Sequence, residues 1–273
     1  MGRKIRVTLD EIMCSVAAKE IKDGERVFVG QGYPILAAML AKKRHAPNSL
    51  LIMEGGVIDF EPYRPPLHIA DCTALNGVSC TCDMMDTFSC YLFRGDIDVG
   101  FLGAAQVDKY GNINSSYIGD VENPEMRVTG SGGANEIGGY SKRGIILLRH
   151  GKFVEKLDYL TTPGYLEGYD SRKKVGLPGG PSIVVSSIGV FRFDGKSKEM
   201  YLESYHPGVT VEDIKSKVPW DLRISPNVQR TPLPSDEELA LMRSIAPEIS
   251  LGRAFALQRR TTNLLNFMQA KQM

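Results

Sequence analysis

The chain has 273 residues, of which 33 are lysine or arginine and 32 are aspartate or glutamate, so its formal net charge is +1. Hydrophobic residues make up 42% and charged residues 24%, which excludes a disordered chain, a collagen and a membrane bundle. The near-zero charge gives no electrostatic reason to expect a nucleic acid or an anionic membrane as partner. The length fits one large α/β domain, expected to span residues 1–273.

The beginning of the sequence predicts a cytoplasmic location. Residues 1–10 are polar and charged and contain no apolar stretch typical of a secretion signal. No apolar run approaches the ~20 residues that a membrane helix requires. The cysteines number five, and an odd count without a secretion signal favours reduced thiols over a disulfide framework.

Helix signals alternate with short apolar strands in the first hundred residues. The expected elements are a helix from Thr8 through about Lys22, a strand at Arg26–Val29, a helix at 35–41 preceded by Pro34, and strands at Leu50–Met53 and Ile97–Leu102. Thr8 and Glu11 have the spacing of a capping box, and proline suits the first turn of a helix. Alternation of this kind, with continuous apolar strands, predicts an α/β fold: an open, mostly parallel sheet with helices on both faces.

The second half predicts a continuation of the sheet with fewer helices. The expected strands are Ile145–Leu148, Phe153–Leu160, Ile183–Val190 and Met200–Tyr205. Ser235 and Glu238 form a second capping-box pattern, and a final amphipathic helix is expected from about Ser250 towards Met268. No repeat, low-complexity tract or charge run marks a linker, which favours one continuous domain.

Glu54 is the first candidate for chemistry. It follows an apolar strand directly and precedes Gly55 and Gly56. A carboxylate at the end of a buried strand costs desolvation free energy unless it is used or paired. Ligands of open α/β sheets bind at these strand ends, and two glycines let a substrate approach the backbone closely. The alternative is a structural carboxylate, solvated or paired with Arg64.

Two further segments carry groups that suit ligand binding. Residues 130–135 (GSGGAN) can present successive backbone N–H groups to an anion, as in an oxyanion hole, although a flexible surface loop has the same composition. No Gly-Lys-Ser/Thr follows, so this is not a phosphate-binding loop. The second segment, 103–115, gathers amides and hydroxyls after a strand; within it, Gly111-Asn112 is typical of a tight turn.

The cysteines between residues 72 and 90 are weak candidates for metal ligands. Cys72, Cys80, Cys82 and Cys90 provide only a C-x-C pair flanked by long gaps, whereas structural zinc sites use paired knuckles. Because free cysteines are among the most buried residue types, packed thiols are favoured over a metal site. The four histidines form no motif with each other, and the sequence contains no Gly-x-Ser-x-Gly elbow.

Four motifs in this order resemble the β-type subunits of class I CoA-transferases, and glutaconate CoA-transferases in particular. They are Gly30-x-Gly32-x-Pro34, the strand followed by Glu54-x-Gly56, Gly103-x-x-Gln106 with Tyr110-Gly111-Asn112, and Gly132-Gly133-Ala134. The likeness covers most of the chain. It departs at Gly55, where the family often has Asn or Ser. The resemblance implies an open α/β fold shared with certain sugar-phosphate isomerases.

The resemblance also implies a reaction and its residues. Glu54 would be the nucleophile that carries CoA as a glutamyl thioester between small, mainly dicarboxylic, acids in ping-pong fashion. Backbone groups of Gly132, Gly133 and Ala134 would bind the oxyanion, and a further set would contact substrate: Gly30, Gly32, Gly55, Gly56, Gln106 and Asn114. No metal and no permanently bound cofactor are implied; coenzyme A enters as acyl-CoA. A separate α-type subunit would complete the acyl-CoA pocket.

Two alternatives remain open from the sequence. The first is a CoA-ester hydrolase, or a decarboxylase or lyase, on the same scaffold in ring or branched-acid catabolism. Such an enzyme would not depend on Glu54. The second is a non-enzymatic scaffold or regulatory subunit in which the cysteine cluster binds zinc, for which about one zinc per chain would be the sign.

Overall fold

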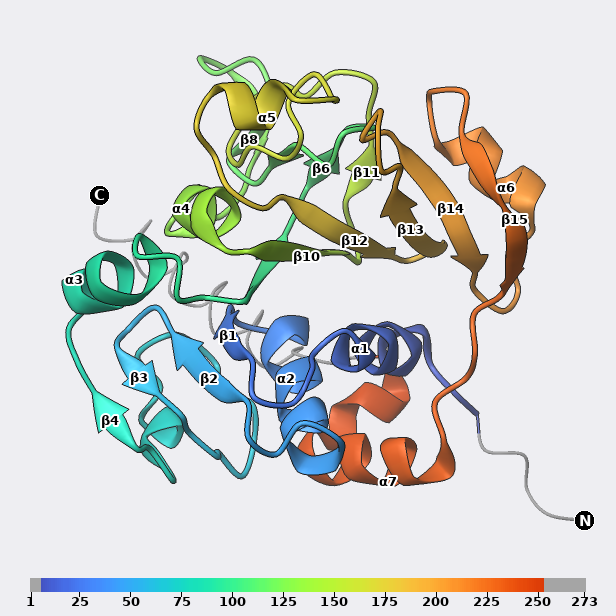
Figure 1. Cartoon of the computed structure of the whole chain (residues 1–273). Helices are drawn as coiled ribbons and strands as arrows, with labels where there is room; N and C mark the ends of the chain where they lie inside the picture. Colours follow the sequence, from blue (N-terminus) through green and yellow to red (C-terminus); the bar gives the residue numbers. More distant parts are fainter. Residues whose placement is uncertain (1–5, 253–273) are drawn as a thin grey trace, which may run out of the picture.

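The computed structural model describes residues 6–252. Within this range, ten strands form one sheet in the order β15-β14-β13-β12-β10-β5-β1-β2-β3-β4 (Figure 1). The five central strands, from β12 to β2, are parallel, and antiparallel pairs extend the sheet on both sides, so the predicted open, mostly parallel sheet is confirmed. The strands are β1 (Arg26–Val29), β2 (Leu50–Met53), β3 (Val57–Ile58), β4 (Cys80–Thr81), β5 (Val99–Gly103), β10 (Arg143–Leu148), β12 (Pro181–Ser186), β13 (Gly189–Phe193), β14 (Met200–Tyr205) and β15 (Arg223–Arg230).

Helices cover both faces of this sheet (Figure 1). They are α1 (Leu9–Lys19), α2 (Tyr33–Arg44), α3 (Met84–Asp86), α4 (Ala134–Tyr140), α5 (Ser171–Lys174), α6 (Val211–Lys217) and α7 (Asp236–Ile245), with the short turns η1 (Cys72–Leu75), η2 (Thr87–Leu92) and η3 (Pro247–Leu251). One buried core joins α1, α2 and α7 to the sheet, and a second joins α4 and α6. In β1, Val27 and Val29 face the first core and Phe28 faces the second. Burial on both faces explains why most positions of the central strands are apolar.

Smaller sheets extend the second core. The strands β6 (Gln106–Val107), β7 (Ile113–Asn114) and β11 (Lys152–Phe153) form one of them, and β8 (Tyr117–Gly119) pairs with β9 (Pro124–Arg127) in the other. Val107, Ile113 and Phe153 are buried in the second core. No helix in the described range of 6–252 combines the length and the apolar character needed to cross a membrane.

The predicted helix starts are confirmed by their hydrogen bonds. Thr8 Oγ1 accepts from the Glu11 N–H at 3.3 Å, and the Glu11 carboxylate accepts from the Thr8 N–H at 2.7 Å, which completes the capping box of α1. Ser235 and Glu238 make the same reciprocal pair at the start of α7. A third box, Thr210 with Asp213, opens α6, a helix that was not expected from the sequence.

Two predicted strands are wrong in extent. The segment Ile183–Val190 is a hairpin of β12 and β13, because Ser186 Oγ accepts from the Gly189 N–H at 3.1 Å and donates to the Gly189 carbonyl oxygen at 2.8 Å, which turns the chain. Of Phe153–Leu160, only the first residue belongs to a strand, and the largely exposed remainder is irregular. The predicted final helix towards Met268 lies almost wholly outside the described residues.

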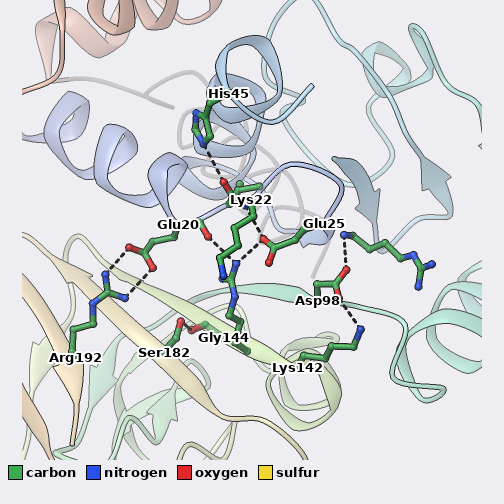
Figure 2. Close-up of polar contacts among 12 residues, drawn as sticks. Glu20, Lys22, Glu25, His45, Asp98, Lys142, Gly144, Ser182 and Arg192 are labelled. Atoms are coloured by element: carbon green, nitrogen blue, oxygen red, sulfur yellow. Dashed lines mark hydrogen bonds and ion pairs between the residues drawn. The ribbon is translucent and has the colours of Figure 1, made fainter. Parts of the chain in front are cut away.

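Ion pairs tie together the edge of the sheet at which the central strands begin (Figure 2). Glu20, just after α1, pairs with Arg192 of β13 at 2.7 Å. Asp98, just before β5, pairs with Lys142 at 2.7 Å and accepts from the Arg26 N–H at 2.9 Å. Because these charges pair with one another, this edge has a structural role. A ligand site is expected at the opposite edge, where the parallel strands end.

A buried histidine makes the stability of the fold dependent on pH. His206 is 1% exposed, with Nε2 2.8 Å from the Ser186 carbonyl oxygen and Nδ1 3.0 Å from Thr231 Oγ1. Burial lowers its pKa to about 4, against 6.5 for an ordinary histidine. Between these two values the unfolded chain binds a proton that the folded chain does not bind.

We therefore expect the free energy of unfolding to fall on acidification from pH 6.5 towards pH 4, by up to about 1.4 kcal/mol per pH unit from this group. Urea unfolding at a series of pH values measures the slope. His206→Gln should flatten the slope over this range even though the variant is less stable at pH 7. An unchanged slope in the variant would show that other groups cause the dependence.

Candidate active site

The carboxyl ends of the central strands bring Glu54 beside the first glycine motif. The strands β1 and β2 are parallel and in register, with Val29 opposite Met53. Gly30 and Glu54 therefore leave the sheet next to each other. Glu54 is half-buried, whereas the three residues before it, Leu51–Met53, are fully buried. The strand thus presents one carboxylate at the edge of the core.

The loop before α4 lies against this carboxylate. A Cβ atom built on Gly132 would lie 3.8 Å from Glu54 Oε1, and one built on Gly133 would lie 3.6 Å from Glu54 Cδ. The Gly133 N–H acts on the carboxylate and lowers its pKa. Two segments far apart in the sequence, both singled out as candidates, are therefore neighbours. The Ala134 N–H, by contrast, donates to the Ser131 carbonyl oxygen at 2.8 Å, so this predicted oxyanion donor is already engaged.

Close packing explains the glycines of this loop. Gly130 and Gly132 have φ values of +88° and +46°, in the left-handed region that glycine tolerates best. Gly133 has an ordinary φ of −87°, but a Cβ there would come within 2.3 Å of Phe88 Cζ. Phe88, on η2, packs against Phe28 of β1 with ring centroids 5.6 Å apart. This ring supports the loop, and it belongs to none of the sequence motifs.

The electrostatic surroundings of Glu54 differ from those of an ion-paired carboxylate. Partial burial, and then the negative charge of Glu136, raise the pKa of Glu54, while the Gly133 N–H opposes the rise. Arg64, the alternative partner, pairs instead with Asp71 at 3.0 Å. Among residues 6–252, no lysine or arginine forms an ion pair with Glu54. The carboxylate is thus half-open to solvent and lies against the loop before α4.

The glycines after Glu54 serve the turn itself. Gly56 has a φ of +88°, and a Cβ there would lie 1.9 Å from the Cys82 carbonyl oxygen. A Cβ on Gly55 would lie 2.8 Å from the Ile69 carbonyl oxygen. This chain's own backbone therefore makes a close approach to both glycines, and the substrate contacts of Gly55 and Gly56 stay a prediction.

The two glycines after β1 have different surroundings: Gly32 has a structural role, and Gly30 borders open space. Gly32 is the N-cap of α2, with a φ of +83° that explains the choice of glycine. Around a Cβ built on Gly30 no other atom lies within 4 Å, so this position borders open space beside Glu54. Of the two predicted contacts, Gly30 remains a candidate for meeting a substrate.

Gln106 and Asn114 belong to a buried network within the fold. Gln106 Nε2 donates to Asp158 at 2.8 Å, and its Oε1 accepts from Asn114 Nδ2 at 2.8 Å. Asn114, fully buried, also donates to the Tyr117 carbonyl oxygen, and its Oδ1 accepts from the Ser116 N–H. These bonds hold β6, β7 and β8 together. Both amides therefore have a structural role in the fold, and their substrate contacts stay a prediction.

We expect Asn114→Ala to lower the free energy of unfolding by about 2–4 kcal/mol, because it leaves several buried groups without hydrogen-bond partners. The Michaelis constants of the protein that remains folded should be unchanged. Denaturant unfolding and steady-state kinetics below the melting temperature separate the two effects. A stable variant with a raised Michaelis constant would place Asn114 in the substrate site.

The turn prediction for Asn112 is confirmed, and the cysteine prediction is wrong. Asn112 accepts from the Gly164 N–H at 2.8 Å and donates to Asp108 at 2.7 Å within the folded turn. Instead of being packed, three of the four clustered thiols are exposed, and the fourth is half-buried: Cys72, Cys80, Cys90 and Cys82. Within residues 6–252, no three or more His, Cys, Asp or Glu side chains are grouped so as to hold a metal ion.

Known proteins share much of this sequence. A family model described as Coenzyme A transferase matches residues 11–217. The B subunit of glutaconate CoA-transferase from Acidaminococcus fermentans is 38% identical over 257 residues, which cover 91% of this chain and 94% of that protein. The B subunit of 3-oxoadipate CoA-transferase from Pseudomonas knackmussii is 40% identical over 239 residues, which cover 86% and 92%.

Solved structures agree with the sequence matches. Glutaconate coenzyme A-transferase from Acidaminococcus fermentans has a TM-score of 0.83 at 36% identity, covering 92% of this chain and 98% of that chain. The decarboxylase AibA/AibB is less similar, with a TM-score of 0.75 at 25% identity, covering 89% and 96%. The family match over most of the sequence, together with these relatives, shows that the chain belongs to the coenzyme A transferase family.

Proposed function

We propose that this chain is the nucleophile-bearing subunit of a CoA-transferase that moves CoA between small dicarboxylic acids through a thioester on Glu54. The observation that carries the proposal is the carboxylate itself: half-exposed at the end of β2, adjoined by Gly132 and Gly133, and in no ion pair with a lysine or arginine of the described residues. The dicarboxylic class is suggested by relatives named for glutaconate and 3-oxoadipate, both dicarboxylates.

The first half-reaction transfers CoA to the enzyme. A carboxylate oxygen of Glu54 attacks the thioester carbonyl of acyl-CoA, the C–S bond breaks, and a mixed anhydride and CoA thiolate form. The thiolate then attacks the Glu54 side-chain carbonyl carbon, the anhydride C–O bond breaks, and the donor acid leaves as its carboxylate. A second carboxylic acid runs the same steps in reverse. Electrons balance without an oxidant or a resident cofactor, and an ionised carboxylate needs no general base.

The loop before α4 suits the second of these steps. Attack by thiolate places negative charge on the carbonyl oxygen of Glu54 itself, and Gly133, whose N–H lowers the pKa of this carboxyl group, adjoins it. The donor is therefore in place before charge develops, which is the arrangement of an oxyanion hole. Gly132, which also adjoins Glu54, offers the neighbouring N–H for the oxyanion of the first step.

An α-type subunit is the proposed partner. The relatives are named as B subunits, and in this chain η2 and the start of α4 adjoin Glu54. Apolar side chains are exposed on or next to these elements and on α3: Met84, Met85, Phe93 and Tyr140. Phe93 and Tyr140, at the ends of η2 and α4, pack edge to face at 4.7 Å, which makes part of this apolar surface rigid. We infer that the partner covers this surface and supplies the remaining walls of the acyl-CoA pocket.

Trapping the covalent enzyme tests the proposal. The chain, complexed with its α-type partner, is incubated with glutaconyl-CoA or 3-oxoadipyl-CoA, and its intact mass is measured. We expect a mass gain of one CoA less one water, located on Glu54 by peptide mapping and removed by an acceptor acid. Turnover of either CoA ester without a trapped adduct would contradict the proposal and favour a hydrolase or decarboxylase.

A further inference from the structure

A second carboxylate follows the loop that adjoins the proposed nucleophile. Glu136 is in the first turn of α4, three residues after Gly133, and its Oε2 atom is buried without a hydrogen-bond partner among the described residues. A buried carboxylate oxygen without a partner destabilises the fold, so a structural role does not explain it. The charge of Glu136 acts on Glu54, raising the pKa of Glu54.

No cation in the described residues neutralises this pair. Arg172, the buried arginine that contacts α4, binds the carbonyl oxygens of Gly138 and Gly139 at the far end of the helix. Its other N–H groups donate to further backbone carbonyls, so all five are engaged. The turn η2, which packs against α4, contributes the Phe88 ring to the loop rather than a basic group. Among the described residues, no lysine or arginine therefore forms an ion pair with Glu54 or Glu136.

We propose that Glu136 is a positioning residue whose negative charge drives Glu54 towards its acylated form. The inference rests on the proposed nucleophilic role of Glu54. In the free enzyme both side chains are carboxylates and repel each other across a partly buried gap. In the anhydride and in the glutamyl-CoA thioester, Glu54 has no charge, and the repulsion is gone. Glu136 thereby raises the free energy of the resting enzyme without raising that of the intermediate.

The test measures how much enzyme is present as thioester. The complex with the α-type partner is equilibrated with a fixed ratio of glutaconyl-CoA to glutaconate, and intact mass gives the ratio of thioester to free enzyme. Glu136→Gln keeps the size of the side chain and removes its charge. We expect this ratio to fall about tenfold, because the uncharged amide no longer repels the free Glu54 carboxylate. Glu136→Asp keeps the charge and should restore most of the ratio.

Control variants separate the effect of the Glu136 charge on the thioester ratio from damage to the fold. Glu212→Gln removes an exposed carboxylate in the first turn of α6 and should leave the ratio at the wild-type value. If Glu136→Gln is not obtained folded, Glu136→Met provides an uncharged side chain of similar size. Equal ratios in wild type and Glu136→Gln, or equal losses in the Gln and Asp variants, would overturn the inference. Absence of any thioester in the wild-type enzyme would instead overturn the proposed function.

Discussion

Replacing Glu54 with glutamine should abolish CoA transfer, lowering kcat by about 10⁴-fold or more, the scale on which the loss of a covalent nucleophile acts. Glutamine keeps the shape of the side chain, so the turn formed by Gly55 and Gly56 should survive. The amide is a far weaker nucleophile than the carboxylate, and no thioester should be detected by mass. Initial rates with saturating donor and acceptor, together with intact mass, measure both effects.

A matched control lies a short distance along the chain. Glu61 is an exposed glutamate whose replacement by glutamine makes the same chemical change away from the nucleophile, and it should leave kcat within about twofold. Substantial turnover of a CoA ester by Glu54→Gln would favour the hydrolase or decarboxylase alternative. Loss of activity in Glu61→Gln would point instead to general damage.

The central sheet was predictable because its signals are local. The strands β1, β2 and β14 have the bounds expected from their apolar runs, and the helices α1 and α7 begin at their capping boxes. The carboxyl-edge position of Glu54 follows from the same pattern, since parallel strands end on one side of a sheet. The nearness of Gly132 and Gly133 to Glu54 was expected only through the family resemblance.

Side-chain contacts between distant segments were not predictable in this way. The hairpin at Ser186 depends on the hydrogen bonds of one hydroxyl group with the Gly189 backbone. Apolar residues lie on both sides of this turn, so the sequence resembles one long strand. Gln106 and Asn114 were predicted as ligand contacts because they are polar residues that follow a strand. The sequence does not show that the two amides form a hydrogen bond with each other. Phe88 belongs to η2 and Glu136 to the short helix α4, and no periodic pattern of apolar residues predicted either element.

Adding one methyl group at Gly133 should impair catalysis more than stability. The backbone there suits alanine, with a φ of −87°, but the new Cβ would lie 2.3 Å from Phe88 Cζ. Since the ring is held by Phe28, the loop must move, and the Gly133 N–H moves away from Glu54. We expect Gly133→Ala to lower kcat by about 10²–10³-fold, as for the loss of one oxyanion donor, with thioester formation impaired.

The steric contact between the added Cβ and Phe88 can be tested by shortening the side chain of Phe88. Phe88→Leu shortens the ring that the Cβ would strike, so Gly133→Ala combined with Phe88→Leu should recover most of the kcat lost by the single variant. Gly195→Ala, at a turn where a Cβ meets no atom within 4 Å, controls for the substitution of glycine by alanine. Rescue by the second substitution would establish that the N–H position, rather than glycine flexibility, supports the reaction. A double variant as slow as Gly133→Ala would contradict this explanation, because relief of the steric contact would then have left the proposed oxyanion donor unrestored.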